Sequence, residues 1–128
     1  MTAMTKSVLL SALVLVAASV PFVGVAAAEG DAARPAAFAV CAGCHTVEAG
    51  KTSFGPNLRG VVGRKAGSLP DYAYSKALSS SDIVWTTQNL DSWLTSPQKT
   101  VPGTKMPFPG YADPKKRKQV IDYLATLE

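Results

Sequence analysis

The sequence predicts a small all-α domain of short helices joined by ordered loops, and three observations predict this class. The clearest is a C-terminal helix, for which Asp113 suits the N-cap and Pro114 the first helical position. The second is the stretch 50–70, which is dense in glycine and proline and has no sustained periodicity. The third is a length of 128 residues, which allows one domain or at most two, with no visible repeat or boundary.

The N-terminal segment has the layout of a secretory signal peptide. Lys6 supplies a positive charge, the run 8–25 is almost entirely apolar, and three alanines at 26–28 provide small residues for cleavage. An uncleaved membrane anchor is the alternative, because about 20 apolar residues can span a bilayer. The alanine-rich end favours cleavage, so we expect residues 1–28 to be the signal peptide and 29–128 the mature domain. No later segment is apolar enough to span.

Further helices are expected within the domain. A short helix should follow Pro35, which fits best near a first turn. Helical signals return at 72–79, and again from Thr87 to the residues before Pro97. The C-terminal helix is the best defined, with one apolar stripe. That stripe consists of Val120, Ile121, Leu124 and Leu127.

About 100 residues bury only a thin core, so a domain of this size usually needs a disulfide, a metal or a cofactor. Cys41 and Cys44 are three positions apart, and a disulfide between them would restrain little of the unfolded chain. Together with His45 they form the haem-attachment pattern Cys-Ala-Gly-Cys-His. Two thiols one helical turn apart can add to the two vinyl groups of a porphyrin, and the next residue then places an imidazole against the iron.

Three other interpretations of this motif are weaker. A thioredoxin-type motif expects a βαβ setting, which the sequence lacks. A Cys/His zinc site cannot be completed, because the chain has no other cysteine and no other histidine. A structural disulfide leaves the adjacent His45 unexplained. We therefore predict one haem c, attached covalently through Cys41 and Cys44.

The second axial ligand can be chosen by elimination. His45 is the only histidine, and Met106 is the only methionine outside the predicted signal peptide. A lone methionine is more often core filler, but this one lies in a loop stiffened by Pro102 and Pro107. We predict His45/Met106 ligation, which raises the reduction potential. With both axial positions filled by protein, no site remains for oxygen or peroxide, which favours electron transfer over catalysis.

With these residues in place, the sequence resembles a class I c-type cytochrome, of the mitochondrial cytochrome c and bacterial cytochrome c2 kind. The resemblance covers nearly the whole mature domain and implies a cytochrome c fold of short helices and loops wrapped around one haem. The matching motifs, in the family's order and spacing, are Cys41–Val47, Gly55–Leu58, Gly63–Lys65, Pro102–Met106 and Tyr123-Leu124.

The resemblance also implies roles for further residues. The carbonyl of Pro56 would accept the proton on the distal ring nitrogen of His45. Thr104 would support the haem from the methionine loop, and Phe108 would cover it near the exposed edge. The positions that hydrogen-bond or neutralise a buried propionate correspond to Arg64, Tyr74 and Trp85. The alternatives to these roles are that Arg64 is an ordinary surface charge and that Trp85 belongs to the hydrophobic core.

The sequence departs from the family pattern at three places. Trp93 stands where the family usually has a tyrosine hydroxyl near the methionine sulfur. Leu78 replaces a polar side chain and makes the haem pocket drier. Arg34 and Pro35 lie where the family prefers a small glycine, so the first helix is expected to start later or to dock less tightly.

The function implied is that of a soluble, monomeric electron carrier, not an enzyme, in the periplasm. The expected donor is a quinol–cytochrome c reductase-type complex, and the acceptor an oxidase, a photosynthetic reaction centre or a reductase. Partners would dock on a haem edge rimmed by lysines, which steer encounter more than they add affinity. These are Lys51, Lys76, Lys99 and Lys105. Secretion and a mature net charge of about +3 argue against nucleic acid.

Two other functions stay open from the sequence. A haem enzyme or gas sensor would need a labile Met106, and a dedicated carrier would serve one periplasmic dehydrogenase or reductase. The basic run 115–118 also has two interpretations, a solvated face or a docking patch for an acidic partner.

Overall fold

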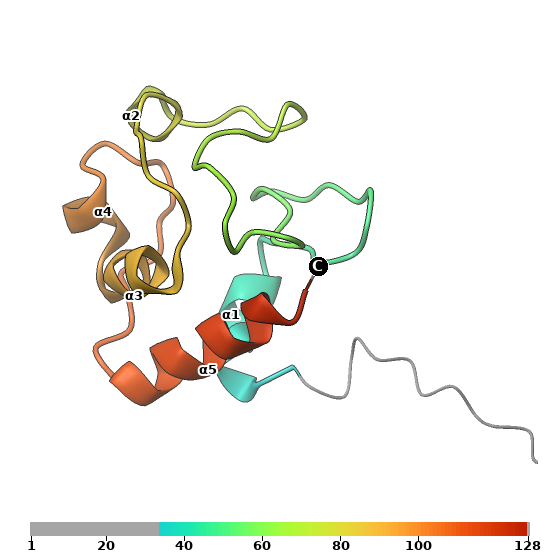
Figure 1. Cartoon of the computed structure of the whole chain (residues 1–128), viewed down its shortest axis with the longest axis vertical. Coiled ribbons are helices and arrows are strands. Elements are labelled where there is room, and N and C mark those ends of the chain that lie inside the picture. Colours follow the sequence, from blue (N-terminus) through green and yellow to red (C-terminus); the bar gives the residue numbers. More distant parts are fainter. Residues whose placement is uncertain (1–33, 128) are drawn as a thin grey trace, which may run out of the picture.

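The structure is a computed structural model that describes residues 34–127, and Figure 1 shows its arrangement. The predicted signal peptide 1–28 lies outside these residues. The helical elements are η1 (Ala36–Phe38), α1 (Ala39–Ala42), α2 (Lys76–Ser79), α3 (Thr87–Thr95), α4 (Pro97–Thr100) and α5 (Pro114–Ala125). Residues 34–127 contain no β-strand and only one isolated bridge, between Lys65 and Val84. The predicted all-α class is confirmed.

The C-terminal helix α5 forms as predicted. The Asp113 carboxylate accepts a hydrogen bond from the backbone N–H of Lys115 at 2.9 Å, and Pro114 opens the helix. The apolar stripe is buried against α3 and η1, which pack along α5 (Figure 1). Among residues 34–127, no helix is long and apolar enough to cross a membrane.

The first helix begins late and still docks closely on α5. Pro35 is extended and caps a 3-10 turn, so helical structure starts only at Ala36. Phe38 then lies in the contact with α5, where it is 1% exposed and its ring meets that of Tyr123 edge-on, with 4.9 Å between the centroids. The expected late start is therefore present, while this aromatic pair keeps the docking tight.

The helical prediction for 72–79 is wrong for its first four residues. The helix α2 begins at Lys76, because Ser75 is extended and its hydroxyl accepts the N–H of Leu78 at 3.2 Å as an N-cap. The prediction for α3 is confirmed, with Thr86 as its cap and an end before Pro97. The same proline starts the short α4, which the sequence analysis did not predict.

The glycine- and proline-rich stretch 50–70 is an ordered loop, as predicted. Asn57 holds it from within: its side-chain amide donates to the carbonyls of Glu48 at 2.7 Å and Lys51 at 2.9 Å. The amide oxygen of Asn57 accepts from the backbone N–H of Arg59 at 2.8 Å. One polar side chain thus supplies the hydrogen bonds that a helix or sheet would otherwise provide.

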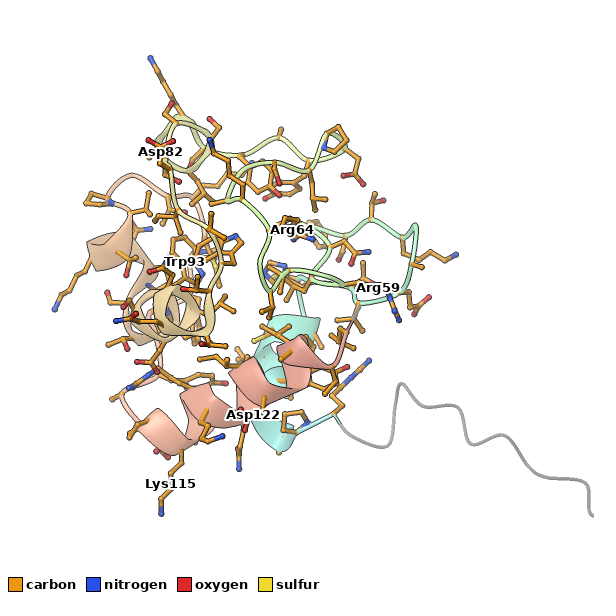
Figure 2. All side chains as sticks on the ribbon, in the orientation of Figure 1. Arg59, Arg64, Asp82, Trp93, Lys115 and Asp122 are labelled. Atoms are coloured by element: carbon orange, nitrogen blue, oxygen red, sulfur yellow. The ribbon has the colours of Figure 1, made fainter. Side chains whose placement is uncertain are left out.

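The basic run 115–118 is not a uniform charged patch. The side chain of Arg117 is 13% exposed, and its Nε donates to the carboxylate of Asp91 on α3 at 2.7 Å. Its Nη1 also donates to the backbone carbonyl of Tyr111 at 2.9 Å. Lys118 pairs with Asp122 one turn along α5, at 2.6 Å, whereas Lys115 points away from the body of the protein (Figure 2). Arg117 is therefore a structural link between two helices.

Candidate functional site

A single cavity of about 510 Å³ gathers nearly all the predicted site residues. Its walls come from the Cys-x-x-Cys-His turn, the loops before and after α2, helices α3 and α5, and the methionine loop. Figure 2 shows Trp93 reaching the site from α3 and Arg64 from the long loop. The predicted residues that line the cavity are Cys41, Cys44, His45, Pro56, Arg64, Tyr74, Trp85, Trp93, Thr104 and Met106.

The two cysteines lie one helical turn apart, as thioether attachment requires. Cys41 belongs to α1, and its carbonyl accepts from the backbone N–H of Cys44 at 3.1 Å and of His45 at 2.9 Å. Cys41 is buried and Cys44 is exposed. Before haem attachment, burial raises the pKa of the Cys41 thiol to about 11.

The imidazole of His45 is oriented for metal ligation. Its Nδ1–H donates to the carbonyl of Pro56 at 2.8 Å, which leaves Nε2 with a free lone pair. Burial lowers the pKa of His45, and the hydrogen bond to Pro56 raises it in part. The ring is therefore neutral at neutral pH, the form in which imidazole binds iron.

Gly55 lies against the imidazole ring, and the sequence analysis assigned it no role. A Cβ at this position would lie 2.5 Å from Cε1 and 2.7 Å from Nδ1 of His45, so only glycine leaves room for the ring. The N–H of Gly55 donates to the carbonyl of Cys44 at 2.7 Å, which fixes the approach. The backbone of Gly55 does not have a positive φ, so conformational preference alone could not have revealed this steric role.

The methionine loop is held by Gln98, a residue that the sequence analysis also missed. The Gln98 side-chain amide donates to the carbonyl of Thr104 at 2.7 Å, and the N–H of Thr104 donates to the carbonyl of Val101 at 3.1 Å. Thr104 is buried, and the half-buried Met106 lines the cavity beside it. These bonds fix the backbone on which the thioether is carried.

The cavity has an apolar body with positive charge in its wall. The guanidinium of Arg64 donates to the carbonyls of Asn57 at 2.8 Å and Arg59 at 2.9 Å, and burial lowers its pKa while Tyr74 and Asp71 raise it. Burial also raises the pKa of Tyr74, so its hydroxyl stays protonated and can donate a hydrogen bond. Among the described lining residues, only Arg64 and Lys105 carry full charge, and none is acidic.

Aromatic side chains form much of the remaining wall. Trp85 and Trp93 are both buried and meet edge-on, with 5.1 Å between their ring centroids. Leu78 is buried in the same wall, as its apolar character predicts. Two aromatic lining residues, Phe54 and Tyr72, were missed by the sequence analysis, because they lie in loops without periodicity.

Two expectations about the rim stay predictions. Phe108 is half-buried, and its ring packs edge-on against Tyr111, with 5.0 Å between the centroids. Its role as a cover of the haem edge is not decided by this contact. Of the four predicted rim lysines, only Lys105 lines the cavity. The other three, Lys51, Lys76 and Lys99, are exposed on the surface.

These residues fit a haem. The cavity offers a pair of thiols at thioether spacing, a neutral imidazole, a thioether sulfur, apolar walls for a porphyrin and an arginine for its acidic side chains.

Comparison with known proteins agrees with this fit. The family model described as cytochrome c matches residues 31–128.

The chain belongs to the cytochrome c family. It is 51% identical to cytochrome c2 of Rhodopila globiformis, over 70% of this chain and 84% of that protein. It is 47% identical to cytochrome c of Trypanosoma brucei brucei, over 63% of this chain and 87% of that protein. The solved structure of cytochrome cH from Methylobacterium extorquens matches with a TM-score of 0.69 and 51% identity, over 74% of this chain and 96% of that one.

Membership decides several of the sequence predictions. Cytochromes c carry covalently bound haem c, and Cys41 and Cys44 have the spacing for it, so the predicted cofactor is confirmed. The family consists of electron-transfer proteins that act with redox partners, so the chain is a haem-containing electron carrier and not an enzyme.

Proposed function

We propose that this cytochrome is a soluble periplasmic one-electron carrier whose haem iron is held by His45 and Met106. The observation that carries the proposal is the convergence of these two side chains and both cysteines on one cavity. A histidine and a methionine are the axial pair that raises the potential of a c-type haem. When bound, the haem supplies an iron that alternates between its ferric and ferrous states.

The residues of this chain keep that site rigid. Pro56 holds the His45 ring by a hydrogen bond and Gly55 by close contact, and Gln98 fixes the loop that carries Met106. Arg64 would supply a positive charge to the acidic side chains of the haem, and Tyr74 and Trp85 line the same cavity. A site that is already organised in this way changes little between redox states, which suits fast electron transfer.

Location and partners are also part of the proposal. The apolar pattern of residues 1–28 and the names of bacterial cytochrome c2 relatives support export to the periplasm, with 29–128 as the mature domain. The intact mass of the purified protein tests cleavage before Glu29. The electron donor would be a quinol–cytochrome c reductase-type complex, and the acceptor an oxidase, a reaction centre or a reductase. A positive surface would steer a monomer to such partners.

Replacement of Met106 tests the ligand assignment. In Met106→Ala we expect a midpoint potential well below that of the wild type, and binding of carbon monoxide by the reduced protein, because one axial position is then open. Redox titration and absorption spectroscopy measure both effects. Met106→His is the matched variant: a second imidazole should close the site to carbon monoxide again while the potential stays low.

Two outcomes would contradict the assignment. One is a Met106→Ala protein with the wild-type potential, which would show that the sulfur does not bind iron. The other is a reduced wild-type protein that binds carbon monoxide, which would indicate a labile ligand and favour a sensor or enzyme. Circular dichroism of each variant shows whether the helices are retained.

A further inference from the structure

The methionine loop, 101–110, has few hydrogen bonds of its own after its first residues. Its start is held by Gln98, whose side-chain amide donates to the carbonyl of Thr104 at 2.7 Å. In the part of the chain that the structure describes, residues 105–110 make no backbone–backbone hydrogen bond. The position of the loop beyond Met106 therefore depends on the residue that ends it, which is Tyr111.

Tyr111 is fastened to three helical elements where the chain passes α3 on its way to α5 (Figure 1). Its N–H donates to the carbonyl of Leu94 in α3 at 2.7 Å, and its carbonyl accepts from Nη1 of Arg117 in α5 at 2.9 Å. Its hydroxyl donates to the carbonyl of Ala37 in η1 at 2.7 Å. The first two bonds use backbone groups of Tyr111, so only the third requires a tyrosine at this position.

The backbone places the Tyr111 ring before the hydroxyl bond forms. The preceding residue, Gly110, has a φ of +109°, and an added Cβ there would collide with the carbonyl of Thr95 at the end of α3. Glycine alone permits this close approach. The hydroxyl therefore meets its acceptor from a fixed backbone, at a small cost in conformational entropy.

The Tyr111 side chain connects the two segments that hold the haem. Its acceptor, Ala37, belongs to η1, which runs directly into α1 and Cys41. Its ring packs edge-on against that of Phe108, two positions after Met106, with 5.0 Å between the centroids. One side chain thus links the segment of the thioether attachment to the segment of the axial sulfur.

We propose that Tyr111 is a positioning residue for Met106: its hydroxyl keeps the methionine loop closed and so keeps the sulfur on the iron. Proteins open locally at free energies below that of global unfolding, and loops with few contacts open first. Outward movement of the loop after Met106 must break the bond to Ala37. This inference rests on the proposed His45/Met106 ligation and adds to it a residue outside the cavity.

An added ligand measures how often the loop opens. Imidazole binds the ferric iron only when Met106 has left it, so its apparent Kd is the intrinsic Kd divided by the open fraction. In Met106→Ala the position is already open, and this variant supplies the intrinsic Kd. A variant that loosens the loop should lower the apparent Kd toward this limit.

The experiment titrates imidazole into the ferric, haem-loaded wild type, Tyr111→Phe and Met106→Ala, and follows binding by absorption spectroscopy. We expect Tyr111→Phe to lower the apparent Kd about fivefold, the effect of losing one hydrogen bond from the closed state. The midpoint potential should stay near the wild-type value, because Met106 is still bound in nearly all molecules. In the double variant of Tyr111→Phe and Met106→Ala, the Kd should equal that of Met106→Ala, since no sulfur remains to be positioned.

The matched control is Tyr123→Phe. It removes the same hydroxyl from a buried ring that packs against Phe38 of η1, and this hydroxyl has no hydrogen-bond partner among the described residues. Its apparent Kd for imidazole should match that of the wild type. Guanidinium unfolding of each variant measures global stability separately.

Three results would overturn the inference. An unchanged apparent Kd in Tyr111→Phe would show that the hydroxyl supports the fold alone, while the proposed ligation stands. An equal decrease in Tyr123→Phe would assign the effect to general loosening of the helices. Equal Kd values in the wild type and Met106→Ala would show that the sulfur does not bind the iron, and would overturn the ligation and this inference together.

Discussion

The helical corner of the molecule and the loop walls of its haem cavity are stabilised in different ways. In the helical corner, made of η1, α3 and α5, buried apolar side chains pack together, and Phe38 and Val120 are each 1% exposed. In the loop walls, which comprise 44–75 and 101–110, single side chains such as Asn57 and Gln98 hydrogen-bond to several carbonyls. The corner is held by burial, and the walls by directional bonds and close contacts.

Because of this difference, we expect the corner to govern mainly the stability of the protein and the loop walls mainly its redox properties. Burial in the corner scales with apolar area and tolerates small shifts, whereas hydrogen bonds and close contacts in the walls set the position of individual atoms. We therefore expect substitutions of corner residues that do not line the cavity to change mainly the free energy of unfolding. Substitutions in the walls should change mainly the spectrum and the midpoint potential.

The largest expected effect is that of Phe38→Ala. The ring is almost fully buried, meets Tyr123 edge-on and does not line the cavity. Its removal should lower the free energy of unfolding by about 3–5 kcal/mol, the usual cost of Phe→Ala in a core, and leave the midpoint potential near the wild-type value. Guanidinium unfolding of the holoprotein and redox titration measure the two quantities.

The control for this variant is Val40→Ala. Val40 follows Phe38 by two positions, and its side chain is exposed. It should change the free energy of unfolding by about 0.5 kcal/mol or less. A large shift of potential in Phe38→Ala would mean that the corner and the walls are coupled, and the separation drawn between them would be wrong.

The second effect, on the wall side, is that of Gly55→Ala. The added methyl group would lie 2.5 Å from the His45 ring, so the ring must move or the loop must open. We expect a destabilisation of about 1–3 kcal/mol, as for other overpacked sites, together with a changed absorption spectrum and midpoint potential. Compared with Phe38→Ala, this variant should lose less unfolding free energy and show a larger change in midpoint potential.

A matched glycine is available as the control. At Gly43 the nearest atom to an added Cβ is the carbonyl oxygen of Val40, at an ordinary 3.5 Å, so Gly43→Ala should be tolerated. If both alanine variants had the wild-type spectrum and potential, the contact between Gly55 and His45 would not set the position of the ring.

The same contrast explains what could be predicted from the sequence. The corner follows periodic patterns and caps, and so α5 and its Asp113 cap were predicted correctly. The Cys-x-x-Cys-His motif is local, and so the haem attachment was predicted as well. The role of Gly55 depends on a contact ten positions away along the chain, and that of Gln98 on a loop closed by its own side chain. Such contacts leave no periodic signal in the sequence.

The smallest expected effect concerns Tyr111, which joins the two regions. Its hydroxyl donates to the carbonyl of Ala37 at 2.7 Å, and its N–H donates to the carbonyl of Leu94 at 2.7 Å. Tyr111→Phe removes only the first bond and should lower the free energy of unfolding by about 1 kcal/mol at neutral pH. The midpoint potential should not change, because Tyr111 does not line the cavity.

The pH dependence of this variant tests the same bond. Burial raises the pKa of Tyr111, so the folded protein holds the phenol proton more tightly than the unfolded chain does. The resulting contribution to stability is fully present below the ordinary tyrosine pKa of about 10 and is lost as the pH rises through the higher folded value. The difference in unfolding free energy between wild type and Tyr111→Phe should therefore shrink at alkaline pH. A difference that stays constant between neutral pH and the alkaline range would show that the hydroxyl does not link the methionine loop to the first helix.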